Sequence, residues 1–144
     1  MAFYELDQVV DYIADLLNAN KVTIGLTAVV REERKLLLGQ YPQCLVAPYK
    51  LMREGSDVGR NFRLEFQIYI YVIHANLKQT SAVRTKTDLQ IARRVTTTLH
   101  GDMSLGGNIP GSWVAEEEPV FPEFKNVNTI ATLLKWVGIN KEVV

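Results

Sequence analysis

The stretch NFRLEFQIYIYVIHAN, residues 61–76, alternates apolar and more polar side chains over most of its length. A period of two indicates a β-strand, because successive side chains of a strand point to opposite faces of the sheet. The apolar face comprises Leu64, Phe66, Ile68, Ile70 and Val72. A polar connection and a helix pattern follow up to residue 100, and residues 101–109 read GDMSLGGNI. These segments in series predict a long strand with a helix packed on its apolar face.

This helix has two competing first turns. Thr87-Asp88-Leu89-Gln90 fits a capping box, in which the Thr side chain accepts a hydrogen bond from the Gln amide and the Gln side chain accepts one from the Thr amide. Ser81 is the competing start. The predicted buried stripe is Leu89, Ala92, Val95, Thr96 and Leu99. We expect Gly101 to end the helix in a left-handed conformation and Gly106-Gly107 to adopt positive φ in the turn.

The rest of the chain, residues 1–144, completes a single α+β domain. The further elements expected from periodicity and from Gly, Pro and Asn are a helix at 3–18, a strand at 22–28, a short edge strand at 43–47, a turn or loop at 53–61, strands at 113–121 and 127–137, and a loose tail or short edge strand at 139–144. This order predicts a mainly antiparallel β-sheet of four to five strands with two α-helices packed on one face.

Composition is that of an ordinary globular protein, with 47% hydrophobic and 22% charged residues. Sixteen basic residues balance sixteen acidic ones, so no overall field draws the chain to nucleic acid or to an anionic membrane. Cys44 is the only cysteine, so an intramolecular disulfide is excluded, which fits synthesis in the cytoplasm. We expect Cys44 to lie in the core. No apolar run approaches the roughly 18 residues of a membrane span, and the first residues show no signal-peptide pattern.

The sequence contains no motif for catalysis, metal binding or cofactor binding. His74 and His100 are the only histidines, and neither belongs to an HxxxH or HExxH pattern. His74 is expected to end a strand, and His100 to occupy the last helical turn, where a positive charge suits the helix dipole. Gly106-Gly107 follows a helix, whereas a phosphate-binding loop precedes one. We therefore expect a protein that is not an enzyme and that needs no metal or cofactor.

Charge is unevenly distributed over the second half of the chain. Residues 78–100 hold five basic residues against Asp88, and residues 113–124 hold four glutamates and no basic residue. Two such patches of opposite sign can dock head to tail and close a ring, although two ordinary solvated surfaces give the same distribution. The candidate subunit-interface residues are Arg84, Lys86, Arg93, Arg94, Glu116, Glu117 and Glu118. The three glutamates also fit a solvated edge that discourages strand pairing, or a paired-carboxylate site.

Several of these features together resemble the tail terminator (tail completion) proteins of long-tailed bacteriophages. The features are the N-terminal amphipathic helix, the strand at 62–74, the helix ending at Leu99 and the turn GDMSLGGNI. A helix followed by a short LGG turn and a strand recurs in that family. Residues 36–48, LLLGQYPQCLVAP, also look like the family's strand-and-proline region. The resemblance covers most of the chain.

The resemblance implies a homohexameric ring that caps the tail tube, stops its polymerisation and offers a surface to the neck or head-completion protein. DNA would pass through the lumen without being read, and the protein would sit at the head-proximal end of the virion tail after assembly in the host cytoplasm. Arg53 and Arg60 are expected contacts to the tail tube or to a neighbouring subunit. Two other readings stay open: another connector, such as a neck or head-closure protein, and a small-molecule-binding domain with a pocket near His74 or residues 116–118.

Overall fold

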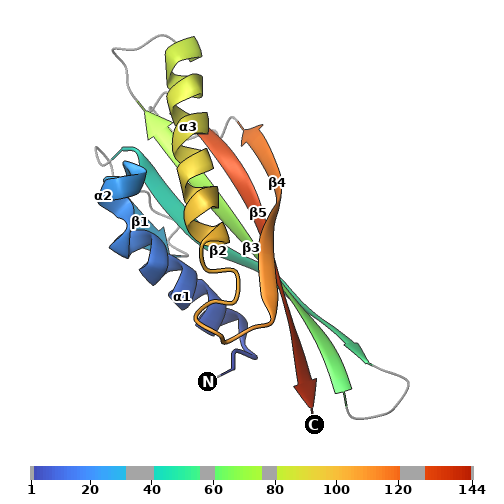
Figure 1. Cartoon of the computed structure of the whole chain (residues 1–144). Helices are drawn as coiled ribbons and strands as arrows, with labels where there is room; N and C mark the ends of the chain where they lie inside the picture. The colour runs from blue at the N-terminus through green and yellow to red at the C-terminus, as the bar shows by residue number, and fades with distance from the viewer. Residues whose placement is uncertain (1, 32–40, 56–60, 76–80, 121–128, 144) are drawn as a thin grey trace.

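The computed structural model describes residues 2–31, 41–55, 61–75, 81–120 and 129–143, which form a layer of helices on one face of a five-stranded sheet (Figure 1). The elements are α1 (Leu6–Ala19), α2 (Lys21–Ile24), β1 (Ala28–Arg31), β2 (Gln43–Gly55), β3 (Asn61–Ala75), α3 (Ser81–His100), β4 (Gly111–Val120) and β5 (Thr129–Val143). The strand order is β1-β2-β3-β5-β4, with β1 and β2 parallel and all other pairs antiparallel. The predicted α+β class and mainly antiparallel sheet are confirmed, and α2 is an additional short helix.

The apolar face predicted for residues 61–76 forms the sheet side of the hydrophobic core. All five of its residues from Leu64 to Val72 are fully buried beneath the helices. The residues that α1 buries are Val9, Val10, Ile13, Ala14 and Leu17. From α3 the buried apolar residues are Ile91, Ala92, Val95 and Leu99. Leu89 was predicted to belong to this stripe, but it is exposed, because the helix turns Ile91 rather than Leu89 toward the sheet.

The ends of both long helices differ from the prediction for identifiable reasons. α1 begins at Leu6 rather than residue 3, because Gln8 Oε1 accepts hydrogen bonds from the amides of Tyr4 (3.0 Å) and Glu5 (3.1 Å). α3 begins at Ser81, the competing start, so the start predicted at the Thr87 capping box is wrong. The Thr87 hydroxyl instead donates to the Val83 carbonyl inside the helix (3.0 Å).

Three strand predictions were also wrong. Residues 22–28 alternate like a strand, yet the chain forms α2 there and then takes a left-handed turn at Gly25 (φ 96°) before β1 begins. Residues 43–47 are not an edge strand, because β2 continues to Gly55 and lies between β1 and β3. Residues 139–143 are not a tail, because β5 extends through them, paired with β3 as far as Val143.

The GDMSLGGNI turn joins α3 to β4 and is fixed by its own hydrogen bonds. Gly101 does not adopt a positive φ, and the left-handed conformations fall on Leu105 (φ 49°), Gly106 (φ 68°) and Gly107 (φ 84°). The Asp102 carboxylate accepts one hydrogen bond from the Tyr12 hydroxyl (2.5 Å) and one from the Gly106 amide (2.8 Å). The positive φ predicted for the two glycines is confirmed, and the Tyr12–Asp102 hydrogen bond joins the turn to α1.

Beyond the helices, β2, β3 and β5 continue as a three-stranded arm, at the lower right of Figure 1. The arm is tied to the body near Phe3, whose carbonyl accepts a hydrogen bond from the Asn140 side chain (2.6 Å) and whose amide donates to Asn108 (3.0 Å). No helix within the described residues is long and apolar enough to cross a bilayer.

Candidate assembly surfaces

The face of the sheet opposite the helices carries a cluster of aromatic and cationic side chains. Tyr49 and Tyr69 stack face to face, with ring centroids 4.3 Å apart and planes within 10°. The Lys50 ammonium lies 5.3 Å from the Tyr49 ring, and the Lys135 ammonium lies 5.8 Å from the Tyr69 ring. An open groove of about 440 Å³ runs between this cluster and Glu116. Half-exposed tyrosines are enriched at protein-binding surfaces, whereas lysines are depleted there.

Two of the three predicted glutamates on β4 point toward the same face. A bulge after Val114 places Glu116 opposite Lys135 in the register, with carboxylate and ammonium 2.8 Å apart, and Glu118 lies 3.7 Å from the same ammonium. The hydrogen bond from Lys135 to Glu116 raises the pKa of that lysine. Glu117 faces the other side, so the predicted alternation along the strand is confirmed. All three glutamates are exposed, and Glu116 and Glu118 share the ammonium of Lys135 on one face of the sheet.

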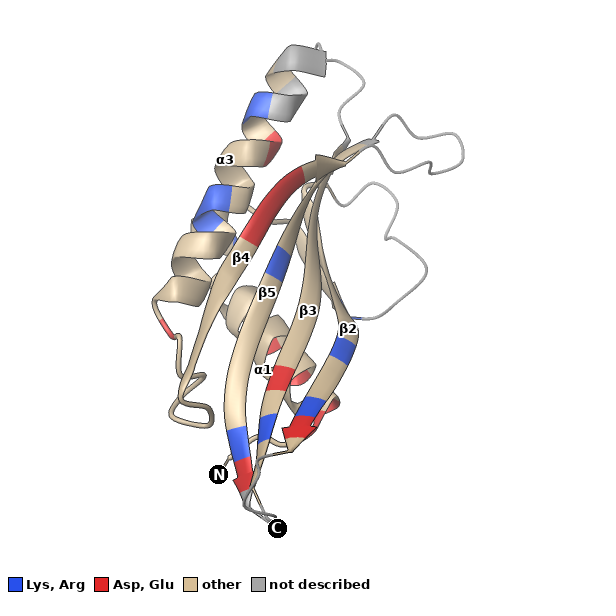
Figure 2. Cartoon of the chain, turned by 90° about the vertical axis from the view of Figure 1, so that its right-hand side faces the viewer, with Lys and Arg blue, Asp and Glu red and all other residues tan. Residues whose placement is uncertain are grey.

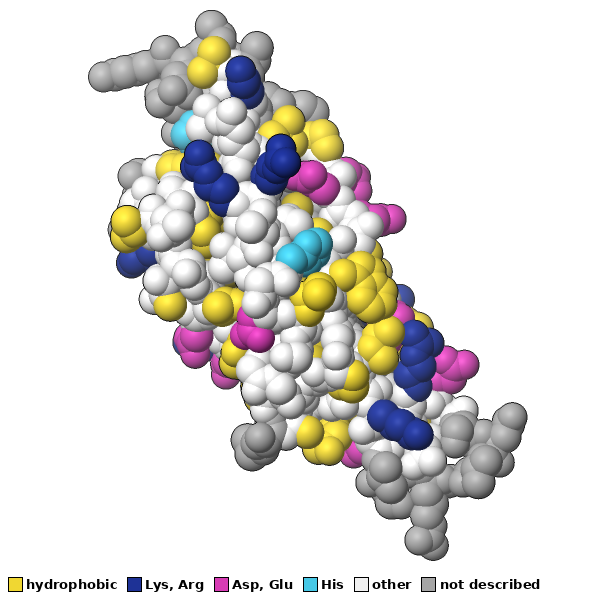
Figure 3. All heavy atoms as spheres, viewed as in Figure 1, with side chains coloured by type: hydrophobic (Ala, Val, Ile, Leu, Met, Phe, Trp, Pro, Cys, Tyr) yellow, Lys and Arg dark blue, Asp and Glu magenta, His cyan; other side chains and the backbone are white. Residues whose placement is uncertain are grey.

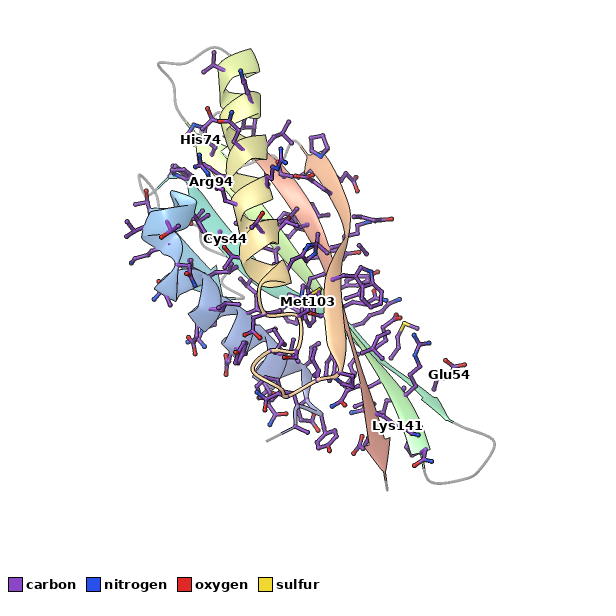
Figure 4. All side chains as sticks on the ribbon, in the orientation of Figure 1. Cys44, Glu54, His74, Arg94, Met103 and Lys141 are labelled. Atoms are coloured by element: carbon purple, nitrogen blue, oxygen red, sulfur yellow. The ribbon has the colours of Figure 1, made fainter. Side chains whose placement is uncertain are left out.

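The basic residues predicted on α3 do not form one patch. Lys86 and Arg93 are exposed, and neither forms an ion pair with a described residue. Arg94 lies beside α2 (Figure 4), and its guanidinium donates to the Ile24 carbonyl (3.3 Å), so it caps the end of that helix. Arg84 lies in α3, but its side chain falls outside the described residues.

The predicted basic and acidic sets lie on neighbouring elements. α3 packs against β4 as well as β5, and the charged segment of β4 faces the viewer beside α3 in Figure 2. Figure 3 shows the same arrangement on the surface, with acidic side chains next to the basic side chains of α3. A head-to-tail contact needs complementary patches on opposite sides of a subunit. That the basic residues of α3 dock on the glutamates of β4 in a neighbouring subunit stays a prediction. The two sets are adjacent within one subunit, which does not favour such a contact.

The arm contributes a second group of candidate residues. Arg53 is exposed on β2, whereas Arg60 lies outside the described residues. Glu54 and Lys141 lie near the end of the arm (Figure 4), beside an open groove of about 550 Å³ that extends to Pro110 and Ile139. Sequence reasoning missed Tyr49 and Lys50 of the aromatic cluster. It ended the predicted strand at residue 47 because Pro48 follows, whereas β2 continues through both residues to Gly55.

The His, Asp and Cys side chains of the described residues have mostly structural surroundings. They contain no group of three or more His, Cys, Asp or Glu side chains placed to hold a metal ion. His100 is engaged structurally, since its Nε2 accepts the Val114 amide (3.1 Å), and His74 is buried at the end of β3 as predicted. Among the described carboxyl groups, the strongly perturbed one is Asp88 on α3; burial raises its pKa to about 7, and it accepts a hydrogen bond from Thr132 (2.7 Å).

Comparison with known proteins adds one result on the fold. No family model matches the sequence, and no curated protein matches it. Among solved structures, the fold is similar to a chain described as "Virion of native gene transfer agent (GTA) particle", with a TM-score of 0.60 and 14% sequence identity. The alignment covers 96% of this chain and 99% of that one. At this identity the likeness establishes a shared fold over nearly the whole of both chains.

Proposed function

We propose that this chain is a non-enzymatic structural protein of a phage-like virion, and specifically a tail terminator. In this role a homohexameric ring caps the completed tail tube, stops its polymerisation and presents a surface to the neck or head-completion protein. DNA passes through the lumen without sequence-specific contacts. A tube end exposes an unsatisfied subunit interface, and a ring that matches it on one side only prevents further addition.

One observation carries this proposal: the fold matches a virion chain from end to end, with 96% and 99% of the two chains aligned. Such two-way coverage means that the likeness extends over nearly all of both aligned chains and not over a single motif. The resemblance of the GDMSLGGNI turn and its flanking elements to tail terminators points in the same direction. Gly106 and Gly107 both adopt positive φ, a conformation that glycine adopts without strain. Turn geometry can therefore explain why the LGG sequence recurs in that family.

The chemistry of the surface also supports an assembly role. The exposed features of the described chain are stacked tyrosines, lysines and glutamates on a sheet face, not a deep pocket with convergent polar groups. A centre of tyrosines with polar and charged residues around it is the arrangement found in many protein–protein interfaces.

The proposal is tested by negative-stain microscopy of the purified protein, alone at high concentration and after mixing with tail tubes assembled from the tube protein of the same genome. We expect rings with a central hole, or tubes capped at one end only. A protein that stays monomeric and never decorates a tube end contradicts the proposal. Tubes polymerised with and without the protein give a second readout, because capping limits their length.

A second connector role, as a neck or head-closure protein, draws on the same likeness to a virion chain. The same microscopy separates the two roles if DNA-filled heads are included as an alternative target. Binding to heads rather than to tube ends favours the neck or head-closure protein.

A further inference from the structure

Among the described residues, the sheet has two edges without a paired strand, on opposite sides of the molecule. β1 pairs with β2 only as far as Val46, so residues 47–55 have no described strand on their outer side. β4 is the last strand at the other end of the order, and no described strand pairs with its outer side. The two edges are three strand spacings apart, about 14 Å. An open edge presents unpaired N–H and C=O groups that a strand of another chain can satisfy.

The two edges carry opposite charge. Lys50 and Arg53 are exposed on the β2 edge, and Glu116, Glu117 and Glu118 are exposed on the β4 edge. The register distributes them over both faces of the sheet. Lys50, Glu116 and Glu118 lie on the face without helices, whereas Arg53 and Glu117 lie on the helix side. A cation on each face of one edge therefore has a carboxylate on the same face of the other edge.

We propose that copies of this chain assemble head to tail by docking the β2 edge of one copy on the β4 edge of the next. In the antiparallel register that places Lys50 opposite Glu118, Arg53 and Glu117 are diagonal neighbours on the helix side of the sheet, within reach of a long side chain. This inference rests on the proposed ring and identifies its interface. Because the two edges differ, the contact is heterologous, and copies add until the rotation closes the ring.

Charge selects this contact over the competing ones. Three consecutive carboxylates on β4 repel a second β4 edge but attract a basic edge, so like edges do not pair. Arg63 lies 3.8 Å from the carboxylate of Glu54 on β2, and Lys135 lies 2.8 Å from that of Glu116 on β4. If both pairs are set aside, each edge keeps two charges of its own sign, Lys50 and Arg53 on β2 and Glu117 and Glu118 on β4. The cations of α3 lie beside β4 in the same subunit, whereas the β2 edge lies on the far side of the sheet, where a head-to-tail contact needs its complement.

A complementary charge exchange tests the contact. One variant carries K50E and R53E, which makes both of its edges acidic. The other carries E117K and E118K, which makes both edges basic and keeps the closer Lys135–Glu116 pair at 2.8 Å. We expect each variant alone to self-associate at least about tenfold more weakly than the wild type at low salt, because every contact joins like charges. Mixing them in equal amounts restores alternating rings, since each contact again joins opposite charges.

The competing contact through α3 is tested by reversing two other exposed cations, with K86E and R93E; if the β2 and β4 edges form the contact, assembly does not depend on them. Sedimentation velocity and tube capping should both stay within about twofold of the wild type. A second measurement does not depend on the stability of the ring in solution. The double variant R53C and E117C is treated with a short bismaleimide, with the buried Cys44 as an unreactive background. We expect a ladder of covalent oligomers, whereas each single-cysteine variant stops at dimers.

Three outcomes separate the two proposals. Rescue by mixing together with a cross-linked ladder supports the edge contact. If both charge-exchange variants still form rings or cap tubes but K86E and R93E abolish them, the edge contact is overturned. The tail-terminator role is then still supported. A wild-type protein that shows no rings and no capping, together with no ladder from the R53C and E117C double variant, overturns both.

Discussion

Replacement of Asp88 with Asn should change how the stability of the fold depends on pH. Asp88 is 2% exposed between α3 and the sheet, and burial raises the pKa of its carboxyl from 3.8 to about 7. The hydrogen bond from Thr132 acts in the opposite direction and is the smaller effect. One oxygen of the carboxyl, Oδ1, has no described hydrogen-bond partner. The folded state therefore favours the neutral form of this group.

The sign and the size of the effect follow from linkage. Between pH 4 and pH 7 the folded state binds a proton at Asp88 that the unfolded chain has released, so the wild-type free energy of unfolding falls as pH rises. Below about pH 4 both states hold the proton, and above about pH 7 both have lost it, so the loss is complete there. A shift of about three pKa units at 1.36 kcal/mol per unit gives an upper bound of about 4 kcal/mol. Asn cannot ionise, so D88N should lack this loss.

Urea unfolding of both proteins from pH 4 to pH 8 measures the difference, with the fluorescence of the buried Trp136 as the probe. We expect D88N to be close to or below the wild type in stability at pH 4 and to exceed it by a few kcal/mol at pH 8. The control D15N removes an exposed carboxyl from α1 and should leave the pH dependence as it is in the wild type. A D88N-minus-wild-type difference that stays constant within about 1 kcal/mol over this range refutes the reasoning.

Three further predictions concern single positions. G138A should destabilise the fold by about 1–3 kcal/mol, because the added methyl would lie 2.4 Å from the Trp136 ring, whereas G111A meets nothing within 4 Å; thermal unfolding of the two variants should differ accordingly. G106A should lower the free energy of unfolding more than G107A. Both glycines have positive φ, but only a methyl group at position 106 would lie 2.8 Å from the Tyr12 hydroxyl. Equal decreases of the free energy of unfolding, measured by urea denaturation, would contradict this packing. Cys44 is fully buried, and burial raises the pKa of its thiol, so a thiol reagent should label it only in denaturant, and labelling of the native protein at neutral pH would show that the core opens.

Local periodicity was sufficient for the elements whose pattern is strong. The alternation from Leu64 to Val72 predicted β3 and its buried face, because one residue of slippage would expose every apolar side chain of the strand. The amphipathic stripe predicted α1, and the Gly-Gly pair predicted a turn with positive φ. These signals depend on residues close together in the chain, so the sequence alone determined them.

The tertiary structure decided features that depend on distant residues. The pattern at 22–28 fits a strand, but Ile24 packs in the core and Arg94, 70 residues away, caps α2. Residues 139–143 carry little periodicity, yet β3 pairs with them and draws them into the sheet. The positions of the charged groups follow the same rule. Glutamates 116–118 lie beside α3 and across the sheet from Lys50 and Arg53, because strand order, and not sequence distance, sets which charges face opposite directions.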